Sequence, residues 1–188
     1  MKVALHTCCG PCALEPFDSL AEAHDLLVVF ANPNIQPVGE YERRRDTLLE
    51  WAQRHGVEVR EVDYEPSLWD EAVEGVRHTP GVRCERCYEL RLRQAASVAR
   101  EAGCDALATT LSVSPYQDAE AIDRVGRAVA REAGLAWLFE DFRPRYASAT
   151  QRSRDAGMYR QNYCGCLPSR TEAEQERAAR RERRRRGS

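Results

Sequence analysis

The feature of this sequence that most restricts its fold is a regular alternation of short apolar segments with segments of helical periodicity. The clearest apolar segment is LLVVFAN at residues 26–32, which is typical of a strand buried on both faces of a parallel sheet. The expected strands are residues 2–6, 26–32, 57–64, 106–111 and 136–142. The expected helices are residues 13–24, 40–56, 84–102, 118–134 and 151–162, with a loop around residues 79–81.

This order of elements predicts a single α/β domain. Strands that alternate with helices favour a Rossmann-like parallel sheet with helices on both faces, and 188 residues suit one such domain. We expect this domain to span residues 1–170, followed by a charged helix and an arginine-rich tail over residues 171–188. Ligands of such sheets bind beyond the carboxyl ends of the strands, so the loops at that edge are expected to form the site.

Charge is distributed unevenly along the chain. Residues 177–188 contain seven arginines and one glutamate, a formal charge of +6, so the preceding residues carry −8 of the net charge of −2. An acidic body does not suit a protein that covers nucleic acid over a broad surface. We expect the basic tail to be a solvated arm, and an auxiliary role in RNA binding is the second interpretation. The run from Arg43 to Arg45 is likewise expected on a solvated helix face.

The apolar runs also bear on location. The longest of them is far too short to span a bilayer, and the N-terminal residues lack the apolar stretch of a secretory signal. We therefore expect a cytoplasmic protein that does not bind a membrane.

Eight cysteines in a chain expected to be cytoplasmic indicate metal or redox chemistry, because structural disulfides are rare in that compartment. Cys8, Cys9 and Cys12 follow the first expected strand, and Cys84 and Cys87 form a second C-x-x-C pair where a helix is expected to begin. Thiolates in this number suit either zinc or an iron–sulfur cluster, and the spacing leaves both open.

The remaining three cysteines fall into two classes. Cys164 and Cys166, in the segment YCGC, can chelate one metal or close a small, easily reduced disulfide, since Gly165 relaxes the backbone between them. Cys104 belongs to no such spacing and is expected to be a buried, inert thiol.

Polar residues recur at the expected strand ends and are candidates for substrate contacts or proton donors. Tyr116, Asp118 and Asp141 are candidate acids, and Arg143 is a candidate for charge stabilisation or for binding an RNA phosphate. Asp118 has a second interpretation, because it also stands where it would cap the following helix. The other polar residues at these ends are Asn32, Asn34 and Gln117.

Six segments together carry a resemblance to a known family. They are CCGPC at 8–12, NPNIQPVGEYERR at 32–44, CERCYELR at 84–91, TTLSVSPYQD at 109–118, DFR at 141–143 and YRQNYCGC at 159–166. With these segments, in this order, the chain resembles the cobalamin-independent epoxyqueuosine reductases, the QueH family, over almost its whole length. The resemblance implies an iron–sulfur oxidoreductase of tRNA processing. Its reaction would be the last step of queuosine biosynthesis, in which the epoxide of epoxyqueuosine at the tRNA wobble position is reduced to the alkene.

The same resemblance implies a cofactor and the residues that bind it. The ligands of a [4Fe-4S] cluster would be Cys8, Cys9, Cys84 and Cys87. Cys164 and Cys166 would correspond to a redox-active pair, which the resemblance leaves free to form a disulfide bond or to bind metal. A second iron near the cluster is also implied, with Cys12 as a ligand together with the thiols of that pair. The electron donor, for which a ferredoxin-like protein is one candidate, and the oligomeric state stay open.

Three alternatives stay open as well. Cys9-Gly10-Pro11-Cys12 has the spacing of a thiol–disulfide oxidoreductase motif at a helix N-terminus, where a thiolate is stabilised. The first five elements resemble the PP-loop-like start of nucleotide-binding and tRNA-thiolating α/β enzymes, although thiols stand where those enzymes have a phosphate loop. The third is a zinc-stabilised RNA-binding module, which bound zinc without iron or sulfide would support.

Overall fold

The computed structural model describes residues 1–186, and over this range the strands form one parallel sheet in the order β3-β2-β1-β4-β5. The strands are β1 (Lys2–His6), β2 (Asp25–Phe30), β3 (Val59–Glu61), β4 (Ala106–Thr109) and β5 (Ala136–Leu138). The α-helices are α1 (Gly10–Ala21), α2 (Val38–His55), α3 (Pro66–Ala72), α4 (Pro80–Glu101), α5 (Ala119–Ala133), α6 (Tyr146–Asp155) and α7 (Leu167–Arg186). Two short 3₁₀ helices are η1 (Leu111–Val113) and η2 (Arg143–Arg145). The predicted Rossmann-like fold is confirmed.

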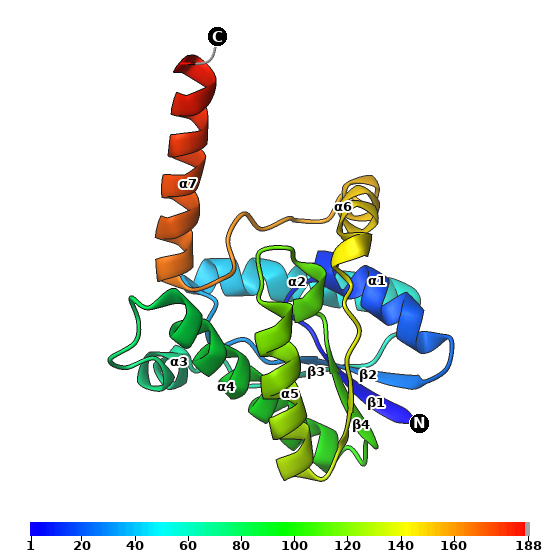
Figure 1. Ribbon diagram of the computed structural model, residues 1–188. Helices are drawn as coiled ribbons and strands as arrows, with labels where there is room; N and C mark the ends of the chain where they lie inside the picture. Colours follow the sequence, from blue (N-terminus) through cyan, green and yellow to red (C-terminus); the bar gives the residue numbers. More distant parts are fainter. Residues whose placement is uncertain (187–188) are drawn as a thin grey trace.

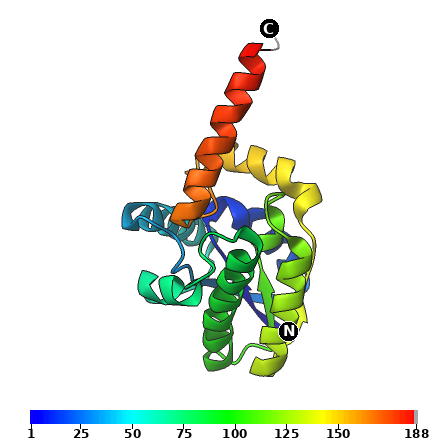
Figure 2. The same ribbon diagram turned by 60° about the vertical axis from the view of Figure 1, so that its left-hand side comes forward.

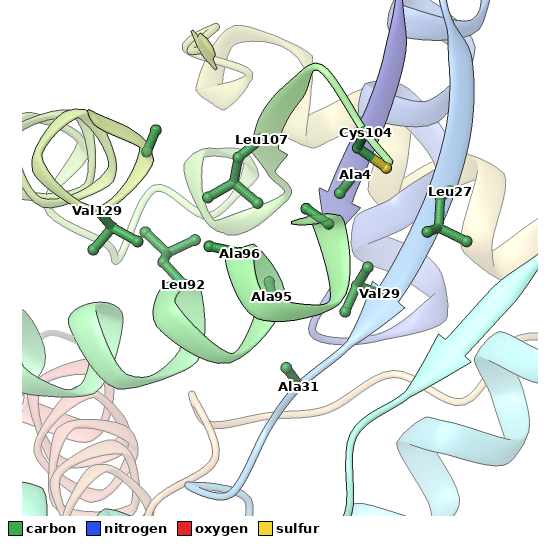
Figure 3. Close-up of a cluster of buried hydrophobic side chains, with 12 residues drawn as sticks. Ala4, Leu27, Val29, Ala31, Leu92, Ala95, Ala96, Cys104, Leu107 and Val129 are labelled. Carbon is green, nitrogen blue, oxygen red and sulfur yellow. The ribbon is translucent and has the colours of Figure 1, made fainter. Parts of the chain in front are cut away.

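Helices cover both faces of the sheet (Figure 1). Side chains of β2 alternate between the faces: Leu27 and Val29 pack against α4 and α5, whereas Val28 and Phe30 pack against α1 and α2. Figure 3 shows the first of these clusters, in which alanines of α4 let the helix approach the strands closely. Burial on both faces explains why β2 reads as a continuous apolar run.

Several boundaries differ from those predicted. The loop predicted around residues 79–81 lies earlier, at residues 73–79, because α4 begins at Pro80, and proline suits a first helical turn that needs no backbone donor. In the same way α1 begins at Gly10 with Pro11 in its first turn, so Cys12 is helical. The seven-residue α3 was not predicted, and β3 and β5 keep only three paired residues each.

The C-terminal part of the chain crosses the carboxyl edge of the sheet and then leaves it. Helix α6 packs against α1 and ends at Asp155, and the following segment runs to α7. Helix α7 extends away from the body in both views and has no buried residue (Figures 1 and 2). It is continuous across residue 171, where a domain boundary was predicted. No helix within residues 1–186 combines the length and the apolar character needed to cross a bilayer.

Candidate functional site

The loops at the carboxyl ends of the strands meet at one edge, as predicted. The Asn32 side chain, after β2, donates a hydrogen bond to the Thr7 carbonyl after β1 at 2.9 Å. The Thr110 backbone N–H, after β4, donates to the His6 carbonyl at 2.9 Å. Seven of the eight cysteines lie along this edge in two groups, which we call the thiol trio (Cys8, Cys9 and Cys12) and the thiol quartet (Cys84, Cys87, Cys164 and Cys166).

The thiol trio spans the β1–α1 loop and the first turn of α1. Its three Sγ atoms are within 4.8 Å of one another, and it is the only group of three or more potential metal ligands found within residues 1–186. The Sγ of Cys9 lies 2.6 Å from that of Cys12 and 3.8 Å from that of Cys8. Cys9 is the N-cap of α1 and Cys12 is in its first turn, so the helix start fixes the geometry.

One sulfur of the trio is predisposed to carry the negative charge. Hydrogen bonds from the Cys12 and Cys9 thiols hold the pKa of Cys8 well below its ordinary value. The pKa of Cys12 is raised, because its thiol is hydrogen-bonded to Cys8 and Cys9, and burial raises the pKa of Cys9. The trio is therefore a compact set of sulfur donors in which Cys8 ionises most readily.

The thiol quartet joins two parts of the chain. Burial raises the pKa of Cys84 to about 11, and burial raises the pKa of Cys87 to about 12; Cys164 and Cys166 lie close enough to add to both shifts. Cys87 and Cys166 also pack in one buried cluster with Trp69. Within residues 1–186 no group of three ligand atoms combines Cys84 or Cys87 with the trio, so the predicted four-ligand set stays a prediction.

Arg91 connects the two groups. Its guanidinium is fully buried and donates to the Asn32 side-chain oxygen at 2.7 Å. Burial lowers its pKa, but the neighbouring thiols of Cys87, Cys8 and Cys164 outweigh that effect and raise it. Among the described residues the Arg91 Nε has no hydrogen-bond partner, and Asn32 is neutral. A buried cation in this setting requires negative charge nearby, and Cys8, whose pKa is lowered, is the neighbouring sulfur best able to supply it.

One face of α4 carries two cysteines of the thiol quartet together with Arg91. Cys84, Cys87, Tyr88 and Arg91 recur at spacings of three and four residues, which places them on one face. The C-x-x-C spacing points to the two cysteines, whereas the burial of Arg91 becomes visible only in the fold.

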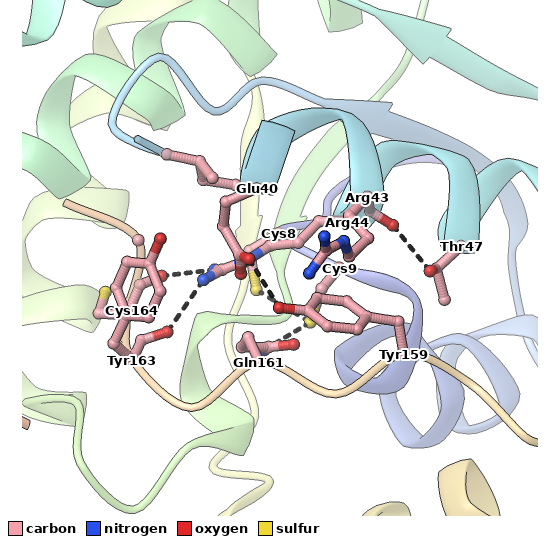
Figure 4. A network of polar contacts seen from close by, with 12 residues as sticks. Cys8, Cys9, Glu40, Arg43, Arg44, Thr47, Tyr159, Gln161, Tyr163 and Cys164 are labelled. Atoms are coloured by element: carbon pink, nitrogen blue, oxygen red, sulfur yellow. Dashed lines mark hydrogen bonds and ion pairs between the residues drawn. The ribbon is translucent and has the colours of Figure 1, made fainter. Parts of the chain in front are cut away.

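A buried ion pair on α2 holds the C-terminal segment against the edge (Figure 4). Arg44 donates to Glu40 at 2.7 Å and to the carbonyls of Tyr163 and Cys164 at 3.0 and 2.7 Å. Tyr159 donates to the second Glu40 oxygen at 2.6 Å. The expectation that residues 43–45 form a solvated face is thus wrong for Arg44, which is 1% exposed.

Two glutamines donate to sulfur. The Gln161 side-chain amide donates to the Sγ of Cys9 at 2.9 Å. The Gln117 amide donates to the Sγ of Cys164 at 3.2 Å, and its oxygen accepts a hydrogen bond from Tyr88 at 2.6 Å. Gln117 was noted only as a polar residue at a strand end, and Gln161 was missed because an isolated glutamine in a loop carries no sequence signal.

Gly165 is required where it stands. Its φ of 152° is a conformation that side chains rarely adopt, and a Cβ there would lie 2.8 Å from the Asn34 side-chain nitrogen. A residue without a side chain is therefore needed between the two cysteines of the CGC segment.

The predicted acids lie farther out. Tyr116 is 77% exposed. Asp118 accepts a hydrogen bond from the Ala121 backbone at 3.0 Å, which confirms its interpretation as a helix cap. Asp141 and Arg143 form an exposed ion pair at 2.6 Å, and Arg143 lowers the pKa of the Asp141 carboxyl. Cys104 lies in the core, as predicted.

The chain matches one family of known proteins over most of its length. A family model described as "Epoxyqueuosine reductase QueH" matches residues 3–172. The Epoxyqueuosine reductase QueH of Thermotoga maritima is 34% identical over 172 residues, which cover 88% of either chain. The protein of the same name from Dehalococcoides mccartyi is 30% identical over 170 residues, which cover 89% of this chain and 92% of that protein.

Solved structures of other proteins share the fold, and two of them are tRNA-related. The U34-tRNA thiolase NcsA from Methanococcus maripaludis, solved with its [4Fe-4S] cluster, aligns with 92% of this chain and 64% of its own, at a TM-score of 0.59 and 15% identity. A predicted subunit of tRNA methyltransferase from Methanocaldococcus jannaschii aligns with 82% of this chain and 76% of its own, at a TM-score of 0.53 and 13% identity. At these identities the likeness shows a common architecture.

The thiol–disulfide oxidoreductase alternative gains no support from these matches. Its attacking thiol would be Cys9, which is 1% exposed and whose pKa burial raises. An attacking thiol of that class needs exposure and a low pKa, so the local environment is unsuitable.

Proposed function

The chain belongs to the epoxyqueuosine reductase QueH family, and we propose that it reduces the epoxide of epoxyqueuosine in tRNA to the alkene of queuosine. The reaction consumes two electrons and two protons and releases the epoxide oxygen as water. The observation that carries the proposal is the gathering of seven cysteines at the carboxyl edge of the sheet, where ligands of such folds bind.

This donor set fits an iron–sulfur cluster. Thiolates are the usual ligands of such clusters, and the buried Arg91 offsets their negative charge. When bound, the cluster supplies single electrons, and an iron with an open position can act as a Lewis acid. The proposed ligands of a [4Fe-4S] cluster are Cys8, Cys9, Cys84 and Cys87, and those of a second iron are Cys12, Cys164 and Cys166.

The CGC cysteines can also supply the electrons that the reaction consumes. Oxidation of the two thiols of Cys164 and Cys166 to a disulfide releases two electrons and two protons, which balances reduction of the epoxide to the alkene and water. Gln117 orients the Cys164 sulfur, whereas Cys166 is 6% exposed. Cys164 is therefore the more accessible member of the pair, and an external donor must reduce the disulfide after each turnover.

A protein acid is needed for the oxygen that leaves. Of the candidates, Tyr116 is best placed to turn toward a docked nucleoside because its side chain is exposed. Asp118 and Asp141 would first have to give up a helix cap and an ion pair. Arg143 lies beside Asp141 at the surface, in a position suited to an RNA phosphate.

The direct test is anaerobic incubation of the iron-loaded protein with a chemical reductant and tRNA that carries epoxyqueuosine, followed by nucleoside mass spectrometry. We expect conversion to queuosine by the native protein and by the control variant Cys104→Ala, whose thiol lies in the core. Cys164→Ala should abolish conversion under turnover conditions. A native protein with full iron and sulfide content that leaves epoxyqueuosine intact would refute the proposed activity.

A further inference from the structure

Helix α7 begins beside the candidate site and ends in an exposed, arginine-rich part. We call this part, residues 178–186, the basic rod. The helix starts at Leu167, the residue directly after Cys166, and residues 178–186 are all exposed. A helix of 20 residues is about 30 Å long. The family model ends at residue 172, so this rod lies beyond the part of the chain that the family accounts for.

The orientation of the rod is fixed at its base. The two terminal nitrogens of Arg83 donate to the two oxygens of Glu172, each at 2.8 Å, and Arg83 is 2% exposed. Arg177 donates to the Asn162 carbonyl at 2.9 Å, next to the segment that carries Cys164. A bidentate pair with a buried arginine holds a direction better than a single contact, so α7 leaves the body along a defined line.

The positive charge of the rod favours binding of a polyanion. Arg180, Arg183 and Arg184 recur at spacings of three and four residues, which puts like charges side by side on the helix. Residues 177–188 carry +6, whereas the rest of the chain carries a net −8, which does not attract nucleic acid at long range. A tRNA that brings its wobble nucleoside to the CGC segment must therefore approach an acidic body, and its phosphates come within reach of the rod.

We propose that α7 binds the phosphate backbone of the substrate tRNA and so compensates for the acidic body. This inference rests on the proposed function for the identity of the RNA, and it assigns the RNA-binding role to residues outside the matched family region. The arm acts on binding and not on the chemical step, because its exposed arginines lie beyond the anchoring contacts of Glu172 and Arg177.

The test compares two triple variants of equal charge change. The first is Arg180→Gln/Arg181→Gln/Arg183→Gln on the exposed part of α7. The control is Arg54→Gln/Arg100→Gln/Arg131→Gln, whose exposed arginines lie in the last turns of α2, α4 and α5, at the opposite edge of the sheet. Binding of an unmodified tRNA transcript is measured by fluorescence anisotropy at several salt concentrations.

We expect the α7 variant to lose about tenfold in affinity, and the slope of log K against log salt to fall by about 2, since each phosphate contact contributes roughly 0.7 to 0.9 to that slope. The control variant should match the native protein. In turnover assays the α7 variant should raise the KM for tRNA and leave kcat unchanged.

Equal affinity and equal salt slope in the α7 variant and the native protein would overturn the inference. If the variant instead loses a salt-dependent self-association, the arm binds the acidic body of a second copy, and the RNA assignment is wrong. Binding is measured without turnover, so native protein that binds tRNA through α7 but leaves epoxyqueuosine unchanged would refute the proposed activity and support the arm.

Discussion

The thiol trio and the thiol quartet lie at the same edge of the sheet, but different kinds of structure hold them. The trio occupies residues 8–12, between the last residues of β1 and the first turn of α1, so local backbone geometry fixes it. The quartet joins α4 to a segment far along the chain, and the buried side chain of Arg44 holds that segment through its carbonyls. One half of the site is thus fixed by residues that are close in sequence, and the other half depends on contacts between distant residues. Mutations should therefore disrupt the two halves separately.

The largest effect is expected within the trio. Cys9→Ala should reduce bound iron and acid-labile sulfide to background and abolish turnover, because Cys9 is central to the donor set, with one neighbouring sulfur 2.6 Å away and another at 3.8 Å. Iron and sulfide are quantified on anaerobically purified protein. Cys104→Ala is the matched control, and native iron content in Cys9→Ala would show that the trio does not bind the metal.

The next largest effect is expected from a substitution that releases the C-terminal cysteines of the quartet and leaves the trio in place. Arg44→Met removes the donor to two carbonyls and leaves Glu40 buried without its cation, so we expect the free energy of unfolding to fall by about 3 kcal/mol. Alkylation of Cys164, followed by mass spectrometry, should accelerate more than that of Cys8.

Arg45→Met is the control for this variant, because Arg45 is the next residue but pairs at the surface with Asp46. Its stability should stay within about 1 kcal/mol of the native value. Equal acceleration at both cysteines in Arg44→Met would mean that the two groups are not held independently.

A smaller effect, on kcat alone, is expected from substituting the residue that contacts Cys164 of the quartet. Gln117→Leu removes the hydrogen bond that positions the Cys164 sulfur. We expect the activation free energy to rise by about 1.4 kcal/mol, which lowers kcat about tenfold. The KM for tRNA and the melting temperature should not change. Tyr88→Phe, which only frees the Gln117 amide to rotate, should have a weaker effect in the same direction. If kcat falls only together with the melting temperature, the role of Gln117 is structural.

The smallest effect concerns α6, which precedes the C-terminal segment. Glu15 on α1 accepts hydrogen bonds from Ser148 and Arg152. Burial raises the pKa of Glu15, but these two partners outweigh it and the net pKa is lowered. A lowered folded-state pKa means that the interaction stabilises the fold above the unfolded-state pKa, and that this stability is lost as the pH falls through the folded-state value.

We therefore expect Glu15→Gln to cost about 0.5 kcal/mol at neutral pH, since Arg152 is partly exposed, and nothing under acidic conditions where native Glu15 is protonated. Chemical denaturation at both pH values measures this. Glu50→Gln, which removes an exposed pair on α2, is the control, and a difference that persists at acidic pH would contradict the assignment.

The sequence predicts the sheet well because its signal is local. The apolar run of β2 and the helical periodicity around it follow directly from burial on two faces. Boundaries are less accurate where hydrogen-bonded pairing, and not composition, decides them, as at β3 and β5. The first turns of α1 and α4 were missed because proline was read as a loop signal, whereas it also begins helices.

The site is predictable where spacing alone brings residues together. Cys8, Cys9 and Cys12 are neighbours in sequence and in space. Arg44 and Arg91 could not be found in this way, because a buried arginine looks like an exposed one until the fold supplies its partners. Gln117 and Gln161 are similar cases, since their roles arise from contacts with sulfur atoms that lie 47 and 152 residues away along the chain.

The single face of α4 that presents Cys84, Cys87, Tyr88 and Arg91 has a consequence for how such proteins can vary. One residue inserted between Cys84 and Arg91 would rotate everything after it by about 100° and turn Arg91 away from the sulfur atoms. Residues on the other faces of the helix can be exchanged, but the count cannot change. Descendants of this gene should therefore show substitutions only between these four positions and have no insertion or deletion within residues 84–91.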